Sequence, residues 1–399
     1  MSIAPCRVLD HARTAVETVA TRLWPGETVR VGPQLPSVTN YVALLRVAEL
    51  SFVAKYSLLG TSLVSVVRGL WGTWPEVEAS QRDYLVDPQA QLAHEHVQLQ
   101  ILAVVARHGA VPLRVPKVIA YAAGVLITVA VRAPSLSAEL LRGSQSPDEL
   151  LSHVADTARH LQRTFGTGHP ALRTTLLSSP HSSITDTYAR KFHNPRHTRE
   201  YLSALGKGWA GPDERREVRE SLTTLRTVLS PLLRPLAPPV VIYGDLTPDH
   251  VFLEAAGYST WIDPGLHCAD PAAELAKLVS RTLLLLVTTP PTQNRASAII
   301  TALDQLLTAF LRHHAPAETH TLRRLLALWL ADWSNYLTTA LSLPPEVLLP
   351  LSPTLLAAAA RARALLLVAT DVAAHLVTNP DHAWYLALRS CHQLARDTN

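Results

Sequence analysis

The pattern of apolar and polar positions divides the chain into a strand-rich first part and a helix-rich second part. Residues 1–30 carry apolar side chains at helical spacing, until Gly32, Pro33 and Pro36 interrupt the pattern and predict a loop. From Tyr41, "YVALLRVAELSFVAKYSLL" contains two runs rich in Val, Leu and aromatic residues on either side of "AELS". Such a pattern predicts an antiparallel hairpin.

One helix and a second pair of strands complete this first part. A helical pattern extends from about Gln89 to His108, and "VPLRVPKVIAYAAGVLITVAV" supplies two further strands that turn around Ala122–Gly124. The segment "RAPS" then has the composition of a linker. We therefore predict a small, β-rich N-terminal lobe over residues 1–133, with one main helix.

The second part is helical on both sides of a short strand-rich stretch. Residues 134–235 are mainly helical in pattern, whereas "VVIYGDLTPDHVFLEAAGYSTWIDPGL" alternates short apolar runs with charged turns. Near the C-terminus, "TLLAAAARARALLLVATDVAAHLV" predicts one buried helix, because its Arg and Asp residues make it a poor membrane span. We predict a helical C-terminal lobe over residues 134–399 that includes this strand-rich stretch, and an α+β fold class.

Composition and cysteine usage narrow the class of protein. The 399 residues are 48% hydrophobic and 17% charged, which is typical of a globular chain with a sizeable core. Cys6, Cys268 and Cys391 lie far apart and match neither a disulfide framework nor a zinc site, so we expect a reducing, cytoplasmic location. Asp10 and Arg13 interrupt the apolar core that a signal peptide would need.

The charge pattern argues against two kinds of partner. The formal net charge is +4, but no run of Lys and Arg with interleaved aromatic residues is present. We therefore expect neither nucleic acid nor a membrane as a partner.

A lysine interrupts an apolar strand in "FVAKYS". An unpaired Lys55 would cost several kcal/mol if buried, so it needs an anionic partner, and Glu95 on the following helix is the natural candidate. A lysine held by a helix glutamate is how phosphotransferases hold the α- and β-phosphates of a nucleotide. A surface lysine at a strand edge is the alternative.

Polar residues also stand at the ends of the short strands in the second part. Gly244 allows a sharp turn before Asp245, whose carboxylate could then be aimed at a substrate hydroxyl. His250 could bind a metal ion, and Asp263 could chelate Mg²⁺ that bridges phosphates. Taken singly, each Asp also fits a turn residue, and Asp249 is expected to face solvent or to cap the turn.

Together these segments resemble the aminoglycoside phosphotransferase and choline kinase superfamily. Its H-G-D-x-x-x-x-N loop and I-D metal motif stand here as "YGDLTPDH" and "WIDPG". "SVTNYVALLRVAELSFVAK" is similar to the nucleotide loop and lysine strand, "AHEHVQLQILAVVARHGAVPLRVPKVIAY" to the glutamate helix, and "TARHLQRTF" to the Leu-His helix. The resemblance extends over about residues 30–280.

The resemblance implies a bilobal protein-kinase-like fold and an ATP-dependent phosphotransferase with a hydroxyl acceptor. Residues 1–133 would be the nucleotide-binding lobe, and residues 134–399 would carry the catalytic loop (240–270) and the acceptor-binding helices. It implies ATP and Mg²⁺ as cofactors, Asp245 as the catalytic residue that takes the hydroxyl proton, and His250 and Asp263 as metal ligands. Lys55, braced by Glu95, would bind the α- and β-phosphates. In "HCADPAAELAKL" the residues Asp270 and Glu274 would be structural.

Three departures from the family pattern bear on activity. Tyr243 stands where the loop histidine of the family mainly braces the backbone. His250 replaces the metal-binding asparagine, as in the macrolide phosphotransferase branch, and a neutral imidazole can bind a metal ion although Mg²⁺ prefers oxygen. The loop "GPQLPSVTNY" lacks glycines, so Ser37, Thr39 and Asn40 are the candidates for binding phosphate. A catalytically inactive, kinase-fold binding module is an alternative.

The acceptor is open between several classes. An aminoglycoside is a polycation and calls for carboxylates, whereas residues 181–236 carry more Lys and Arg than Asp and Glu. We expect a small hydroxyl-bearing molecule, or alternatively Ser or Thr of a precursor peptide that a partner lyase then processes. A basic lobe would suit an acidic leader peptide, although alternating charges in "DERREVRE" also fit a solvated helix. The basic residues are Arg190, Lys191, Arg196, Arg199, Lys207, Arg215, Arg216, Arg219, Arg226 and Arg234.

Overall fold

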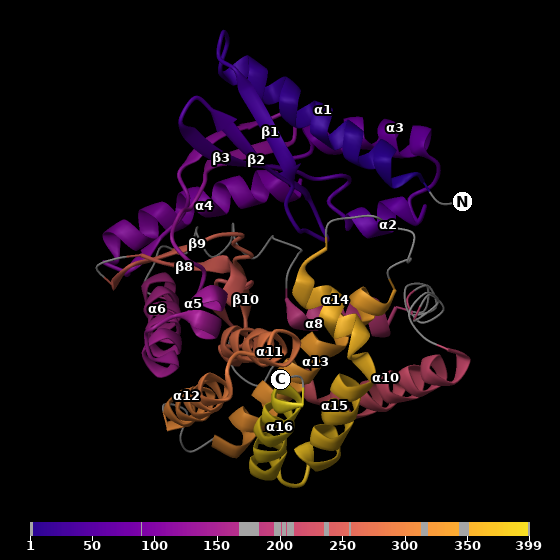
Figure 1. Cartoon of the computed structure of the whole chain (residues 1–399), viewed down its shortest axis with the longest axis vertical. Helices are drawn as coiled ribbons and strands as arrows, with labels where there is room; N and C mark the ends of the chain where they lie inside the picture. Colours follow the sequence, from indigo (N-terminus) through magenta and orange to yellow (C-terminus); the bar gives the residue numbers. More distant parts are fainter. Residues whose placement is uncertain are drawn as a thin grey trace. The chain divides into compact units, whose positions relative to one another are not determined.

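The structure is a computed structural model, shown in Figure 1. It describes residues 3–88, 90–166, 183–194, 201, 205, 211–234, 239–254, 257–312, 318–342 and 351–397. The chain forms two compact units, which we call unit 1 and unit 2. Among the described residues, unit 1 comprises residues 3–104, 114–132 and 351–352, and unit 2 comprises residues 105–113, 133–342 and 353–397.

Unit 1 is built on a five-stranded antiparallel sheet of order β1–β2–β3–β6–β5. Both predicted hairpins are present, and in the register Lys55 lies opposite Val42 on one side and Leu126 on the other. The strands are β1 (Val29–Gln34), β2 (Tyr41–Val47), β3 (Leu50–Tyr56), β5 (Val118–Ala122) and β6 (Val125–Val129).

Alternation along β3 gives the sheet two different faces. Tyr56 and Phe52 face the N-terminal helix α1 (Pro5–Leu23): the Tyr56 hydroxyl is 3.2 Å from the His11 ring, and the Phe52 ring lies 4.9 Å from that of Trp24, just beyond the helix. Lys55 lies between Ala54 and Tyr56, so its side chain points to the opposite face. There it is buried.

Helix α4 (Gln91–His108) brings a carboxylate to that opposite face. Leu92 and Leu99 are buried in one cluster with Leu126 of β6. Glu95 lies three residues after Leu92 and four before Leu99, so helical periodicity places it on the same face. Unit 1 also contains helices α2 (Leu63–Val67) and α3 (Trp74–Val86).

The prediction of a loop from Gly32 was wrong, because β1 continues to Gln34. Pro33 lacks a backbone N–H, but β1 is an edge strand and needs only one partner strand. The register shifts between Val31 and Gln34, which accommodates the Gly-Pro pair.

Unit 2 is mostly helical, with helices α11 and α13 buried along most of their length. The rings of Trp329 and Trp333 on α13 pack edge to face with centroids 5.0 Å apart. The helices are α5 (Leu136–Arg142), α6 (Pro147–Gly166), α8 (Ile184–Phe192), α10 (Pro212–Leu232), α11 (Ala272–Thr288), α12 (Gln293–Arg312), α13 (Glu318–Leu341), α14 (Pro353–Ala360), α15 (Ala362–Leu376) and α16 (Pro380–Arg396).

The short strands predicted between the charged turns form, together with β4, two small sheets. One pairs β7 with β10 and the other has the order β4–β9–β8, and both carry the loops of the candidate site. The strands are β4 (Leu113–Arg114), β7 (Val240–Ile242), β8 (Val251–Leu253), β9 (Ser259–Trp261) and β10 (His267–Ala269), with a 3₁₀ turn η1 (Pro248–His250) before β8.

The C-terminal segment differs from the prediction of one buried helix, because Arg361 separates α14 from α15. The Arg361 guanidinium donates hydrogen bonds to the carbonyls of Val287 and Leu394, so this cation is satisfied within the helical core. Among the described residues, no helix has the length and apolar character that a membrane span requires.

Candidate functional site

The predicted ion pair of unit 1 is present. Lys55 Nζ lies 2.6 Å from Glu95 Oε1, and both residues are more than nine-tenths buried. The carboxylate at hydrogen-bond distance offsets the desolvation cost of the buried ammonium, which an isolated buried lysine would bear in full. The pair thus holds a fixed positive group on the face of β3 that carries α4.

The loop between β1 and β2 contains Ser37, Thr39 and Asn40. The Asn40 backbone N–H donates to Ser37 Oγ at 3.2 Å, and the Val38 carbonyl accepts a hydrogen bond from Leu63 N of α2 at 3.0 Å. The buried Asn40 Oδ1 has no hydrogen-bond partner in the part of the chain that the structure describes. The loop is therefore anchored at its base, while Thr39 is exposed.

Glu274 on α11 holds the backbone that leads into Asp245. Its carboxylate accepts hydrogen bonds from Tyr243 N at 2.5 Å and from Gly244 N at 3.1 Å. Burial raises the pKa of Glu274 to about 7, although the two backbone N–H groups act to lower it. Gly244 has φ +90°, so this anchored turn requires a glycine before Asp245.

Tyr243 ties the Asp245 loop to the Asp263 turn. Its hydroxyl donates to the Ile262 carbonyl at 2.6 Å, and its own carbonyl accepts from Gly265 N at 3.0 Å. Asp263 has φ +58°, a left-handed conformation that is costly for a residue with a Cβ and that persists where surrounding contacts enforce it. Tyr243 therefore braces both loops, as the resemblance implied for the residue at this position.

The structure brings Asp245, His250 and Asp263 together. His250 Nδ1 is 3.1 Å from the Asp245 carbonyl and 3.3 Å from Asp245 Oδ2, and His250 Nε2 is 3.8 Å from Asp263 Oδ2. Because the Asp245 carbonyl can only accept, we assign the proton to Nδ1, which leaves the Nε2 lone pair facing Asp263. A ring N–H held by a carbonyl is the usual support of a metal-binding histidine.

This donor pair fits a divalent cation that also takes ligands from substrate or water. Among the described residues, no group of three or more His, Cys, Asp or Glu side chains has the arrangement of a metal site. Mg²⁺ in phosphotransferases is commonly bound by one or two protein groups plus phosphates and waters. The donor atoms of His250 and Asp263 are compatible with such a pair.

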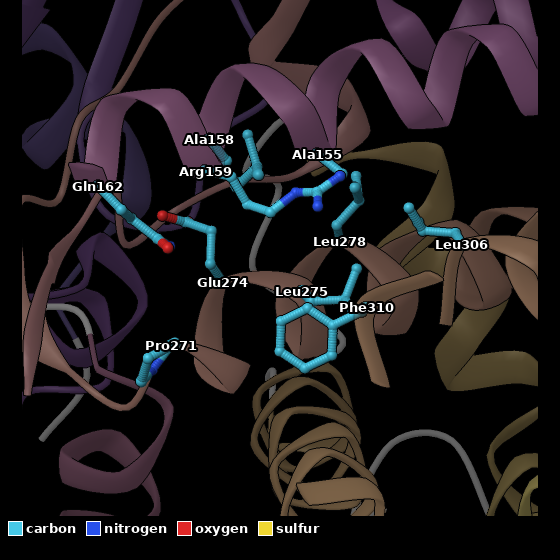
Figure 2. Close-up of a pocket in the computed structure, with 11 residues that line it drawn as sticks. Ala155, Ala158, Arg159, Gln162, Pro271, Glu274, Leu275, Leu278, Leu306 and Phe310 are labelled. Atoms are coloured by element: carbon cyan, nitrogen blue, oxygen red, sulfur yellow. The ribbon is translucent and has the colours of Figure 1, made fainter. Parts of the chain in front are cut away.

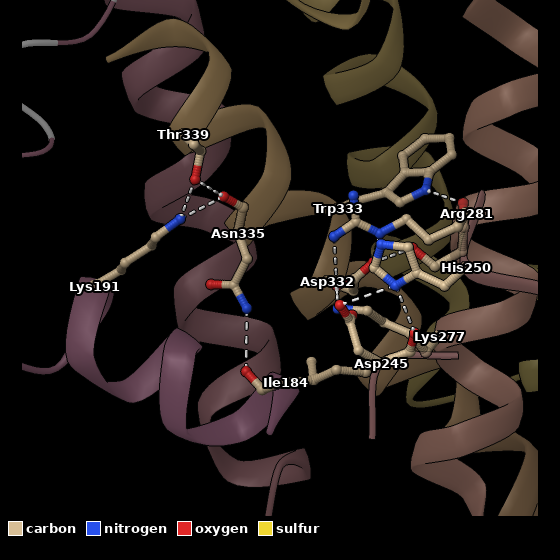
Figure 3. A network of polar contacts seen from close by, with 11 residues as sticks. Ile184, Lys191, Asp245, His250, Lys277, Arg281, Asp332, Trp333, Asn335 and Thr339 are labelled. Carbon is tan, nitrogen blue, oxygen red and sulfur yellow. Dashed lines mark hydrogen bonds and ion pairs between the residues drawn. The ribbon is translucent and has the colours of Figure 1, made fainter. Parts of the chain in front are cut away.

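A lysine and an aspartate to which the sequence analysis gave no role lie in the charged cluster beside Asp245 (Figure 3). Lys277 Nζ on α11 lies 3.3 Å from Asp245 Oδ1 and 3.1 Å from Asp332 Oδ1 on α13. Arg281 Nε is 2.8 Å from Asp332 Oδ2. In the sequence, these residues stand out as charged side chains inside two apolar helical segments, "AAELAKLVSRTLLLLV" and "LWLADWSNYL". Nothing in the sequence indicated that the two segments contact each other.

The remaining acidic residues of the motif region have structural contacts. Asp249 is exposed, as expected, and accepts a hydrogen bond from Ser137 Oγ at 2.5 Å. Asp270 Oδ1 accepts from Ala272 N at 2.9 Å at the start of α11, and its Oδ2 is 3.2 Å from Arg324 Nε.

Comparison with known proteins identifies the family. The sequence profile of the phosphotransferase enzyme family matches residues 79–296, more than half of the chain. The chain belongs to this family. The predicted superfamily and enzyme class are thereby confirmed. No curated protein matches the chain.

Solved structures confirm the kinase-like fold of this phosphotransferase family member. Choline kinase from Cryptosporidium parvum Iowa II is 11% identical with a TM-score of 0.51, and the match covers 93% of this chain and 99% of that one. Amicoumacin kinase hAmiN, in complex with AMP-PNP, Ca²⁺ and Ami, is 11% identical with a TM-score of 0.50, covering 88% and 92%.

Unit 2 of this phosphotransferase contains a pocket that Leu246 lines but Asp245 does not (Figure 2). Helices α6, α11 and α12 line it largely with apolar side chains, and Glu274, already bonded to the loop, is among its few polar groups. Asp245 does not line it, so we do not place the phosphotransferase reaction there. The lining residues are Ala155, Ala158, Arg159, Gln162, Leu246, Pro271, Glu274, Leu275, Leu278, Leu306 and Phe310.

The basic residues that bore on the acceptor are spread over different environments. Lys191 is buried on α8, where its Nζ donates to the Asn335 carbonyl at 2.5 Å and to Thr339 Oγ1 at 2.6 Å, and burial, followed by the nearby Arg190, lowers its pKa to about 7. Most of the others that the structure describes lie on or beside the solvated helix α10. The side chains outside the described residues are Arg196, Arg199 and Lys207.

Gly244→Ala is expected to lower the rate of phosphate transfer about 10²-fold, because a misplacement near 1 Å costs that much. A Cβ at this position would lie 2.1 Å from the Gly265 carbonyl oxygen and 2.7 Å from His267 Nδ1, so the turn before Asp245 must shift. Steady-state kinetics against Gly257→Ala checks this, because Gly257 also has positive φ but open space around its Cβ position. Equal losses in the two variants would refute the steric argument.

Proposed function

We propose that this protein transfers the γ-phosphate of ATP to a hydroxyl group of a small molecule. The observation that carries the proposal is the grouping of Asp245, His250 and Asp263 on two hydrogen-bonded loops of a chain in the phosphotransferase enzyme family. A carboxylate beside a metal-binding pair is the minimum that such a transfer requires from the acceptor-activating part of a kinase-like enzyme.

Asp245 is proposed as the catalytic residue. Its carboxylate would accept the hydrogen bond of the acceptor hydroxyl, orient the oxygen toward the phosphorus atom and take up the proton as the bond to phosphate forms. In unit 1, Lys55 braced by Glu95 would bind the α- and β-phosphates of ATP. Ser37, Thr39 and Asn40 would add hydroxyl, amide and backbone N–H donors for phosphate oxygens.

His250 and Asp263 are proposed as the protein ligands of the divalent cation that accompanies ATP. Mg²⁺ held there would neutralise charge on the phosphate oxygens. The protein would contribute an imidazole nitrogen and a carboxylate oxygen, and the hydrogen bond from Ile262 N to the His250 carbonyl at 2.9 Å holds together the backbone segments that carry them. One nitrogen donor and one oxygen donor discriminate only weakly between Mg²⁺ and Mn²⁺, so Mn²⁺ should also bind.

For the acceptor we propose a small hydroxyl-bearing molecule. The basic residues described on α10 are mostly exposed, and Arg216 pairs with Asp213 and Glu220 on the helix surface. They therefore add little to the argument for an acidic precursor peptide with a partner lyase. That acceptor and the inactive binding module stay predictions from the sequence.

A nucleotide-binding measurement tests the proposal first. We expect Mg-ATP to raise the unfolding temperature, because a ligand that binds only the folded state stabilises it. Transfer from γ-labelled ATP onto hydroxyl-bearing antibiotics, other metabolites and Ser/Thr peptides then identifies the acceptor. A chain without any nucleotide-dependent shift would not be a kinase, and one that binds ATP without turnover would be the binding module.

His250→Asn is expected to shift metal preference from Mn²⁺ toward Mg²⁺ by about tenfold, because the donor changes from imidazole nitrogen to amide oxygen. Half-saturation of activity by each metal, and Mn²⁺ binding followed by electron paramagnetic resonance, measure the shift. His250→Ala, which removes the donor, should weaken both metals. Unchanged binding in His250→Ala would show that His250 is not a ligand.

A further inference from the structure

The Asp245 carboxylate has a cationic neighbour from outside its loop. Lys277 Nζ lies 3.3 Å from Oδ1, while His250 Nδ1 lies 3.3 Å from Oδ2. Each oxygen of the carboxylate therefore faces one nitrogen, and the two contacts together fix the plane of the group. An ionised carboxylate has about four lone-pair sites, so an acceptor hydroxyl can still bind.

Lys277 is itself held in place by Asp332. Asp332 is 2% exposed and also accepts hydrogen bonds from Ser280 Oγ at 2.5 Å and Arg281 Nη2 at 3.1 Å. Burial alone would raise the pKa of Asp332, but Arg281 and Lys277 lower it to about 2. A buried carboxylate with these partners is a fixed anchor for the lysine ammonium.

The helix that carries Asp332 is in turn fixed by contacts with α8. Asn335 lies three residues further along α13, and its Nδ2 donates to the Ile184 carbonyl of α8 at 3.1 Å (Figure 3). Lys191 of α8 donates back to the Asn335 carbonyl. The contacts thus run from α8 through α13 and α11 to the carboxylate of the catalytic loop.

We propose that Lys277, anchored by Asp332, is a positioning residue that holds Asp245 in the orientation needed for phosphate transfer. This inference rests on the proposed function of Asp245. Without the ammonium, His250 is the only side-chain partner left to the Asp245 carboxylate among the described residues, so Oδ1 is released and the group can rotate. A displacement of the catalytic carboxylate oxygens by about 1 Å is enough to lower the rate about 10²-fold.

The test compares Lys277→Met with Arg281→Met. Both remove one cation that contacts Asp332, but only Lys277 also contacts Asp245. The assay is turnover of Mg-ATP, with the identified acceptor or, failing that, with water as the acceptor, which yields ADP and phosphate. We expect kcat to fall about 10²-fold in Lys277→Met with KM for ATP within about twofold, and kcat to fall less than about fivefold in Arg281→Met.

Equal losses of kcat in the two variants would overturn the inference, since they would reflect general disruption of the charged cluster. If Lys277→Met does not fold, Lys277→Gln, which keeps an N–H donor for Asp332, takes its place. If the native protein neither binds nor turns over ATP, the proposed function fails by itself. Crystal structures of the variants then decide the inference: Asp245 must be displaced in Lys277→Met alone, and an unmoved Asp245 contradicts it.

Discussion

Asp245→Asn is expected to lower the rate of phosphate transfer by about 10³-fold while ATP affinity changes less than about twofold. The amide has nearly the same shape but cannot take up the hydroxyl proton, and a positioned general base contributes about 10²- to 10⁴-fold. Because Asp245 is not proposed to contact ATP, an interaction made mainly during transfer is lost, and kcat should fall without a rise in KM for ATP. Steady-state kinetics and ATP titration measure both quantities.

Asp249→Asn is the matched control, because it makes the same chemical change four residues away. Asp249 is exposed and contacts Ser137 rather than the site, so its replacement should leave kcat within about twofold. Joint loss of ATP affinity and transfer in Asp245→Asn would show that Asp245 maintains the fold of the loop instead of acting on the acceptor.

Lys55→Met is expected to remove most ATP affinity and to destabilise unit 1 by about 3–5 kcal/mol. The second effect arises because Glu95, 8% exposed, is left without its ammonium partner, and breaking one side of a buried ion pair is strongly unfavourable. Denaturant unfolding gives the stability change, and ATP titration of the folded protein gives the affinity.

The double variant Lys55→Met with Glu95→Leu separates the two roles of this pair. Apolar replacement of both partners is often neutral for stability, so the double variant should regain most of the lost free energy of unfolding. ATP affinity should stay lost, because no cation is restored. Recovery of affinity together with stability would mean that the pair supports unit 1 and does not bind phosphate.

The parts of the fold and site that depend on local pattern were predictable from the sequence. The Lys55–Glu95 pair follows from a lysine inside an apolar strand and a glutamate on the apolar face of a helix, although α2 and α3 lie between β3 and α4 in the chain. Asp245, His250 and Asp263 stand at the ends of short strands, so a single hairpin brings them together. For these three residues the short spacing along the chain already favours the observed geometry.

The parts that depend on packing between distant segments were not predictable. Lys277 and Asp332 are separated by 55 residues, and their contact exists only because α11 and α13 pack together. Arg361 stands between α14 and α15, and carbonyls from two other helices accept its guanidinium, which local helix propensity does not reveal. The strand at Gly32 and Pro33 was missed because tolerance of proline depends on an edge position in the sheet.

The hydrogen bonds of Tyr243 to the Ile262 and Gly265 backbone have a consequence for directed evolution of this enzyme. They connect the Asp245 loop to the Asp263 turn, so the positions of the two segments depend on each other. A library that varies one loop alone would therefore disrupt the site in many of its members. Substitutions on the exposed side of α10 leave these hydrogen bonds intact. Such a library should therefore hold the residues from Tyr243 to Gly265 constant.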